Sequence, residues 1–268
     1  MTLEVATKAV AVAPQSYQAH MLKGLVEARM IHLSDAESTY ARAVDLNPKA
    51  PEALLALALV ESANEKRRQS QNTFERAIRK FPRHGVIYQE YARMLLKFSA
   101  GSDPEARAKA VSLLQSALAF DGSLAESHYQ LGKLALDDGD LPLATSHLET
   151  AVHLRPAGSR IHFALARAYK RAGRSEQASK ELASFQRLKS QEEKSPDEVI
   201  TKGNSRDPGS GATGNPRESK PGASMKTYIR KYKPFLPLVR AFSWRLEPTI
   251  LESLQGGREF IMIPGWTA

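Results

Sequence analysis

The sequence predicts an all-α fold, an α-solenoid of stacked helix-turn-helix repeats that wind into a right-handed superhelix. Three observations point to it. Prolines recur at a constant spacing, small and large residues recur in step with them, and the small and large residues of a pair share one helical face. A fixed period in the thirties is typical of an array in which each unit is one supersecondary motif. We therefore expect the core to form between neighbouring units rather than in one central globule.

The prolines set the period. Pro14, Pro48 and Pro82 are thirty-four residues apart, and Pro156 follows after two further periods and six extra residues. The extra residues, 99–104, have the composition of a turn, so they are expected to lengthen a loop without breaking the stack. Because proline cannot extend a helix and pushes its predecessor out of helical geometry, a proline is expected to close most of the units.

Small and large residues keep the same register between the prolines. In second helices a small residue stands four places before a large one, which puts both on one helical face. In first helices a large residue is followed directly by a small one, and the small residue lets two helix backbones approach closely. The second-helix pairs are Ala36–Tyr40, Ser70–Phe74, Ala110–Leu114, Ala144–Leu148 and Ala178–Leu182, and the first-helix pairs are Leu57–Ala58, Tyr91–Ala92, Leu131–Gly132 and Leu165–Ala166.

This arrangement resembles the tetratricopeptide repeat (TPR) family, whose unit runs W-x2-L-G-x2-Y, then A-x3-F, then P. The first helices of the early units depart from the pattern. Lys23 takes the leucine slot, and Glu27 and Glu61 take the tyrosine slot, so we expect the first two units to pack less tightly. The best copy contains, in order, His128, Leu131, Gly132, Ala135, Gly139, Ala144, Leu148, Ala151 and Pro156.

The period predicts a TPR array over residues 1–189. It begins with a half repeat, 1–16, which lacks a first helix and leaves open whether Met1 is the true start of the chain. Five repeats follow from about residues 17, 51, 85, 125 and 159. The predicted first helices are 17–30, 51–63, 85–98, 125–137 and 159–172, and the predicted second helices are 34–46, 67–81, 104–120, 141–154 and 175–189.

Composition divides the remaining residues into two segments. Residues 190–224 are rich in Gly, Pro and Ser and contain no aromatic residue. Such a segment has too little apolar surface to order itself, so it is predicted to be a flexible linker. Residues 225–268 hold both tryptophans and an excess of basic over acidic residues, but four prolines interrupt any long helix there. We expect a poorly ordered, basic aromatic tail without an assigned role.

No catalytic or metal-ligating constellation is visible, so we expect a non-enzymatic protein without a metal or cofactor. The chain has no cysteine, no phosphate-cradling glycine loop and no serine elbow. None of the seven histidines pair at the spacing of a metal-binding helix. His128 and His162 occupy the slot where the family has a large aromatic residue, so a structural role is expected for both.

The resemblance implies a binding groove, because in the TPR family first helices line a concave wall that receives extended peptides. We expect the C-terminal half of this wall to hold an acidic segment of a protein or peptide partner, with cations supplying charge and rings supplying contact area. The alternative is that these are ordinary solvated cations of a protein with a net charge of +9. The residues are Arg93, Lys97, Tyr129, Lys133, Arg160, Phe163, Arg167 and Lys170.

Two other functions stay open at this point. A pI near 9.7 and the basic aromatic tail fit nucleic-acid binding. However, repeats that read RNA place code residues at fixed positions in every unit, and the wall residues here differ from unit to unit, so we do not expect a nucleic-acid partner. The other open reading is that the chain is the recruiting module of a larger enzyme truncated before Met1.

The sequence shows neither a membrane span nor a secretory signal. We therefore expect a cytoplasmic protein by default. Export stays open, because the start of the chain is in question. The oligomeric state is not set by the sequence.

Overall fold

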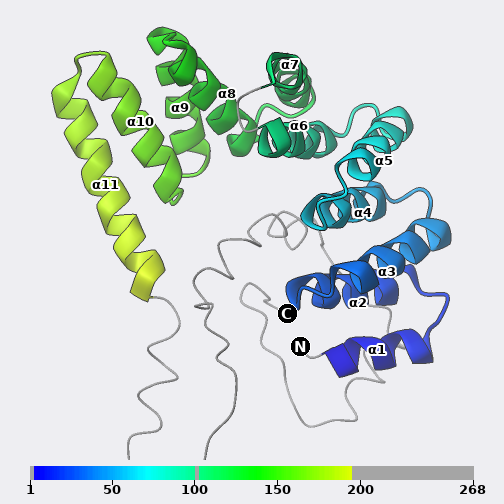
Figure 1. Cartoon of the computed structure of the whole chain (residues 1–268). Coiled ribbons are helices and arrows are strands. Elements are labelled where there is room, and N and C mark those ends of the chain that lie inside the picture. The colour runs from blue at the N-terminus through cyan, green and yellow to red at the C-terminus, as the bar shows by residue number, and fades with distance from the viewer. Residues whose placement is uncertain (1–2, 100–102, 195–268) are drawn as a thin grey trace, which may run out of the picture. The chain divides into compact units, whose positions relative to one another are not determined.

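The computed structural model describes residues 3–99 and 103–194. All regular structure in these residues is α-helical, which confirms the predicted fold class (Figure 1). α1 corresponds to the half repeat, and α2–α3, α4–α5, α8–α9 and α10–α11 pair as the first, second, fourth and fifth repeats. α6 and α7 cover the two predicted helices of the third repeat and belong to different compact units. The helices are α1 (Leu3–Val12), α2 (Tyr17–Arg29), α3 (Leu33–Leu46), α4 (Pro51–Ala63), α5 (Arg67–Lys80), α6 (Gly85–Ser99), α7 (Pro104–Phe120), α8 (Ala125–Asp138), α9 (Leu141–Leu154), α10 (Ser159–Arg171) and α11 (Ser175–Lys194).

The helix bounds lie close to those predicted, with one larger difference at the end of the array. α11 continues past residue 189 to Lys194, so the first residues of the predicted linker are helical. Residues 190–194 are Ser, Gln, Glu, Glu and Lys, most of which are good helix formers, and Pro196 follows two residues later. The rest of the predicted linker and the basic aromatic tail, 195–268, lie outside the described residues.

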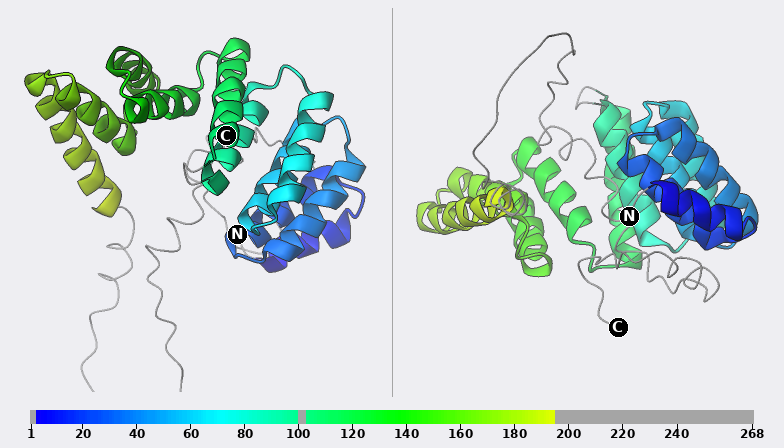
Figure 2. Two further views of the ribbon diagram at one scale, coloured as in Figure 1. Left: turned by 45° about the horizontal axis from the view of Figure 1, so that its top comes forward. Right: turned by 90° about the horizontal axis from the view of Figure 1, so that it is seen from below.

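The described chain forms two compact units, each of which is considered by itself. The N-terminal unit holds α1 to α6, and the C-terminal unit holds α7 to α11. Within each unit, helices that follow one another along the chain lie side by side (Figure 2). First helices of adjacent repeats also meet, α4 with α6 and α8 with α10. Packing between neighbours in the chain is the arrangement of a helical solenoid.

The small and large residues that define the repeat meet in the core. A Cβ atom on Gly132 would lie 2.7 Å from Leu148 Cγ, and one on Gly24 would lie 2.8 Å from the ring of Tyr40. These glycines therefore allow the first and second helices of a repeat to approach closely. The fully buried large residues of the second-helix slot are Tyr40, Phe74, Leu114 and Leu148.

The turn between the two helices of a repeat uses a left-handed residue. In the fourth and fifth repeats this residue is glycine, Gly139 with φ of 84° and Gly173 with φ of 76°. In the first and second repeats the same turn position carries Ile31, with φ of 69°, and Glu65, with φ of 61°. Left-handed geometry places the Cβ of an L-residue too close to the following carbonyl oxygen. The early repeats therefore carry strain in a turn that glycine relieves in the later ones.

Candidate functional site

The exposed positions of α10 carry cations and one aromatic ring. The repeat pattern fills the buried slots of this helix with residues such as Ile161, Leu165 and Tyr169, which pack in the core of the C-terminal unit. The other positions recur at helical spacings of three and four, so they share one face. The exposed residues of α10 are Arg160, Phe163, Arg167, Lys170 and Arg171.

α8 lies beside α10 and contributes Tyr129, which is half-buried, and Lys133, which is exposed. The Arg160 guanidinium lies over the Tyr129 ring, 4.9 Å from its centroid, and pairs with the buried carboxylate of Glu126. Burial raises the pKa of Tyr129, while the nearby charge of Arg160 works against the rise. Because this contact couples the two helices, residues of α8 and α10 form one surface.

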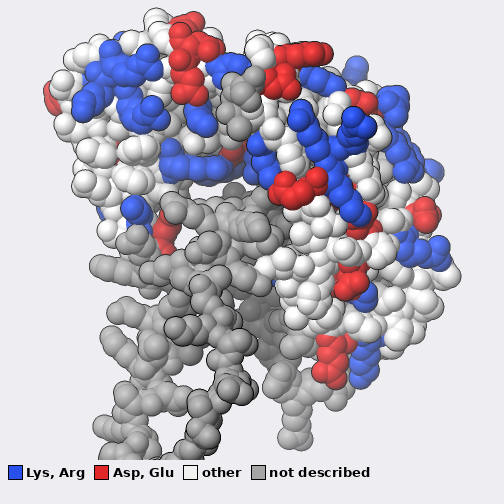
Figure 3. All heavy atoms as spheres, in the orientation of Figure 1, with Lys and Arg blue, Asp and Glu red and all other residues white. Residues whose placement is uncertain are grey.

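We call this surface the cationic face. Figure 3 shows Lys and Arg side chains, in blue, gathered where Figure 1 places α10 and α11. The cationic face consists of Tyr129, Lys133, Arg160, Phe163, Arg167 and Lys170, the predicted groove residues that belong to the C-terminal unit.

The cations of this face differ in how far their charge is already balanced. Arg160 shares the Glu126 carboxylate with Arg155, whose Nη1 lies 3.5 Å from Glu126 Oε2. Lys133, Arg167 and Lys170 are exposed and form no ion pair or hydrogen bond within the part of the chain that the structure describes. The uncompensated positive charge of the face therefore rests on these three side chains.

Phe163 adds apolar area beside the charge. Its side chain is 43% exposed, and its ring centroid lies 5.0 Å from that of Phe185 on α11. Lys189 lies over the Phe185 ring, 5.8 Å from its centroid. Sequence reasoning missed Phe185, because it assigned the groove to first helices alone. The signal was present in the helical spacing, since Phe185 stands one turn after the large residue Leu182.

Arg93 and Lys97, the other two predicted groove residues, lie on α6 in the N-terminal unit. Arg93 pairs with Glu90 on the same helix. Lys97 donates a hydrogen bond to the Ser62 carbonyl at 2.8 Å and pairs with Glu65 at 3.2 Å. Both cations therefore have acidic neighbours of their own, unlike the three uncompensated side chains of the cationic face.

The two histidines of the aromatic slot hold the helices of the fourth and fifth repeats together. Each places Nε2 against the carbonyl six residues earlier, His128 on Gly122 at 3.3 Å and His162 on Pro156 at 2.8 Å. Their Nδ1 atoms contact residues that are one period apart in the sequence. His128 Nδ1 lies 3.0 Å from His147 Nδ1, and His162 Nδ1 lies 2.6 Å from Glu181 Oε2. Sequence analysis predicted the structural role but missed both partners.

Burial lowers the pKa of both members of the first pair, His128 and His147. Their Nδ1 contact is consistent with neutral rings, because one nitrogen must accept the proton that the other donates. His162 differs, because it has an oxygen within hydrogen-bond distance of each ring nitrogen.

Within 3–99 and 103–194, no group of three or more histidine, aspartate or glutamate side chains is arranged to hold a metal ion. Among the helices of these residues, none combines the length and apolarity of a bilayer-spanning segment.

Comparison with known proteins identifies the repeat. Residues 135–191 match the family model described as Tetratricopeptide repeat. No curated protein matches the chain in sequence.

Solved structures share the fold at low sequence identity. A thermophilic TPR protein of Thermus thermophilus is 23% identical, with a TM-score of 0.55 over 69% of this chain and 96% of that one. PilF of Pseudomonas aeruginosa is 16% identical, with a TM-score of 0.57 over 64% and 76% of the respective chains. MamA of Desulfovibrio magneticus RS-1 is 16% identical, with a TM-score of 0.52 over 65% and 96%. Residues 135–191 thus match the tetratricopeptide repeat family, and the chain shares its helical-repeat fold with these solved structures.

Proposed function

We propose that this chain is a non-enzymatic adaptor that binds an acidic segment of a partner protein on the cationic face of its C-terminal unit. Repeats of this family serve in general as scaffolds for protein–protein interaction. The observation that supports the acidic partner is the group of three exposed cations without a counter-charge, Lys133, Arg167 and Lys170, beside the exposed ring of Phe163.

The chemistry of these side chains favours carboxylates. An arginine guanidinium can bind a carboxylate through two parallel hydrogen bonds, and lysine supplies a compact point charge. Arg167 and Lys170 stand on one well-packed helix, so their backbone positions need no ordering when a ligand binds. Such preorganisation lowers the entropic cost of association. Phe163 and Phe185 offer aromatic area for an apolar side chain of the same segment.

We also expect Arg93 and Lys97 to bind acidic side chains of a partner, but with a smaller contribution to the affinity. Each already has a carboxylate neighbour in the N-terminal unit. A ligand carboxylate that binds there must replace an existing partner, so the net gain per contact is smaller than at an unpaired cation. We therefore rank the C-terminal unit first.

The test measures binding of a fluorescent peptide of Glu, Asp, Leu and Phe to the full chain by anisotropy, at a series of salt concentrations. In the double variant Arg167→Glu/Lys170→Glu we expect at least about a tenfold loss of affinity and a weaker salt dependence, because attraction becomes repulsion at two positions. A matched control, Lys8→Glu/Lys49→Glu, changes the net charge equally at exposed positions of the N-terminal unit and should retain binding.

Two outcomes contradict the proposal. Equal losses in the double variant and the control would show that net charge alone attracts the peptide. Retention of single-stranded nucleic acid at moderate salt more tightly than the acidic peptide would favour nucleic-acid binding instead.

A further inference from the structure

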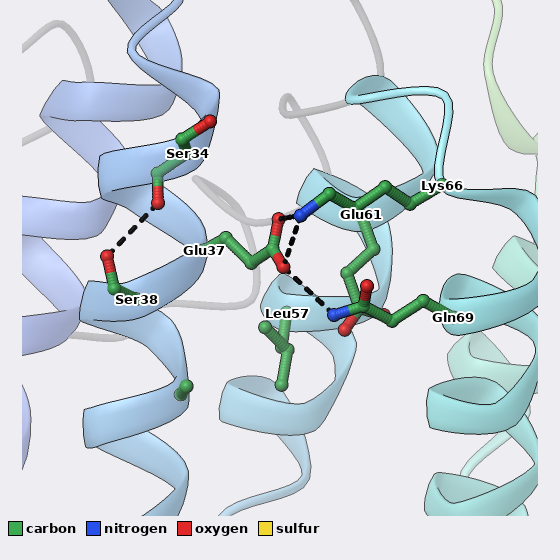
Figure 4. A pocket seen from close by; sticks show the side chains of 8 residues that line it. Ser34, Glu37, Ser38, Leu57, Glu61, Lys66 and Gln69 are labelled. Atoms are coloured by element: carbon green, nitrogen blue, oxygen red, sulfur yellow. Dashed lines mark hydrogen bonds and ion pairs between the residues drawn. The ribbon is translucent and has the colours of Figure 1, made fainter.

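A pocket of about 220 Å³ opens beside Glu61 in the N-terminal unit (Figure 4). Its rim carries the exposed polar residues Ser34 and Ser38 of α3 and Gln69 of α5. Its lining also includes the buried side chains Leu57 and Glu61, one helical turn apart on α4. The pocket therefore combines a polar rim with an apolar side chain and a carboxylate.

The Glu61 carboxylate is buried without full compensation. The residue is 2% exposed, and its Oε2 atom has no hydrogen-bond partner in the described part of the chain. Burial raises the pKa of this carboxyl, and the negative charge of Glu37 adds to the rise, while Thr73, Gln69 and Lys66 act in the opposite direction. A buried polar atom without a partner is costly, so such an atom beside a pocket indicates a missing donor.

The nearest ammonium group is already occupied. Lys66 Nζ donates to both oxygens of Glu37, at 2.9 and 2.8 Å, and Gln69 Nε2 donates to Glu37 Oε1 at 2.9 Å. Figure 4 shows both contacts converging on Glu37, whereas no dashed line reaches the carboxylate of Glu61, which overlaps the Gln69 side chain in this view. Burial works to raise the pKa of Glu37, but these hydrogen bonds and the Lys66 charge hold it below its ordinary value.

The first repeat shows what the second one lacks. Glu27 occupies the same slot as Glu61 one period earlier and is equally buried, at 3% exposure. Its carboxylate pairs with the ammonium of Lys23, one turn earlier on α2, and accepts a hydrogen bond from Thr39 Oγ1 at 2.7 Å. One period later threonine recurs as Thr73, but the lysine slot holds Leu57.

We propose that this pocket receives the cationic head of a lysine or arginine side chain from a partner polypeptide, which pairs with Glu61. The head group takes the role that Lys23 plays in the first repeat. Leu57 lies against the methylene stem of the incoming side chain, as apolar residues do where long cationic side chains extend to water. The serine hydroxyls of the rim accept the remaining N–H donors. This site lies in the N-terminal unit and is separate from the cationic face.

The test follows the carboxyl carbon of Glu61 by ¹³C NMR in the full chain, with its resonance assigned by its loss in Glu61→Gln. The probe is a short peptide with blocked ends and a single central lysine, and the control peptide carries norleucine there. We expect a saturable displacement of the Glu61 resonance with the lysine peptide and none with the norleucine peptide. The Gln69 side-chain amide reports on the same pocket in Glu61→Gln, where the response should disappear.

A second variant supplies the cation internally. Leu57→Lys reproduces the arrangement of Lys23 and Glu27, so its ammonium should fill the site. We expect the affinity for the lysine peptide to fall at least about tenfold, as expected for a lost charge-assisted hydrogen bond. Far-ultraviolet circular dichroism confirms that the variant is folded. Arg167→Glu/Lys170→Glu should leave this binding unchanged, which separates this inference from the acidic-partner proposal. Equal responses to both peptides, or a response that survives Glu61→Gln or Leu57→Lys, would overturn the inference.

Discussion

The first two repeats and the last two each place a buried or half-buried polar residue in the same slot twice, and each time the second copy meets a different partner. In the N-terminal unit the residue is glutamate: Glu27 has the ammonium of Lys23, and Glu61 has a pocket. In the C-terminal unit it is histidine: His128 meets His147, whereas His162 meets the Glu181 carboxylate.

The comparison separates what the repeat determines from what it leaves free. The periodic helix pairs fix where a side chain lies, because small and large core residues set the distance between helices. They do not fix its charge environment, which depends on one or two neighbouring slots. Function can therefore differ between repeats of nearly identical backbone, and the partner slots are where to look for it.

The largest expected difference between the two pairs of repeats lies in their turns. Gly173→Ile places a β-branched residue at φ of 76°, where its Cβ would meet no atom within 4 Å. We expect it to lower the free energy of unfolding by about 1–2 kcal/mol, the conformational cost of left-handed geometry. Ile31→Gly should raise the free energy of unfolding. This increase should be smaller, because glycine loses more entropy on folding and the half-buried isoleucine side chain is removed.

Urea denaturation of both variants, followed by circular dichroism, measures the two free energies. Ala172→Gly, one residue earlier in the fifth-repeat turn, tests whether any change in this turn has the same effect. A destabilised Ile31→Gly variant together with an unaffected Gly173→Ile variant would show that these turns are not strained as their φ angles indicate.

A smaller effect on stability is expected when the His–His pair of the fourth repeat is replaced by a His–Glu pair like that of the fifth repeat. The pKa values of His128 and His147 lie below the ordinary 6.5, so the folded state disfavours their protonation. The pair therefore costs stability as the pH falls below about 6.5, where the unfolded chain takes up protons that the folded chain refuses. His147→Glu gives His128 a carboxylate partner and should raise its folded pKa.

A raised histidine pKa reverses the sign of the pH dependence at this site. The stabilisation is fully present below the unfolded value of about 6.5 and is lost as the pH rises through the folded pKa. We expect His147→Glu to be more stable than the parent by about 0.5–1 kcal/mol at pH 5.5, because the pair is partly exposed. His147→Gln, which removes the ring without adding charge, is the control, and an identical gain in that variant would contradict the explanation.

Much of the fold was predictable because its determinants are local and repeated. Proline spacing gave the period, and pairs such as Ala144 with Leu148 gave the buried faces, so the helix bounds were predicted closely. α11 was predicted too short, since the glycine- and proline-rich composition of 190–224 begins only after helix-forming residues. The strained turns at Ile31 and Glu65 were not predicted, because neither residue type favours left-handed geometry.

The candidate sites were predictable only in part. Helical spacing placed the cations of α10 on one face, but it could not show that Glu126 already binds Arg160 while Arg167 has no partner in the described chain. That distinction depends on contacts between helices of different repeats. The departures at Glu27 and Glu61 predicted looser packing in both early repeats. In the structure Lys23 compensates the first, and the pocket accompanies the second.

The most direct test of the comparison is the titration of the Glu61 carboxyl by ¹³C NMR, in the parent protein and in Leu57→Lys. Without a cation, burial should hold the pKa of Glu61 above the ordinary 4.5, so its stabilising contribution is present below pH 4.5 and is lost as the pH rises through the folded pKa. In the Leu57→Lys variant the pKa should fall, because the introduced ammonium favours the ionised carboxylate. A Glu61 pKa at or below 4.5 in the parent, unchanged in the variant, would contradict the claim that this repeat lacks the cation that the first repeat supplies.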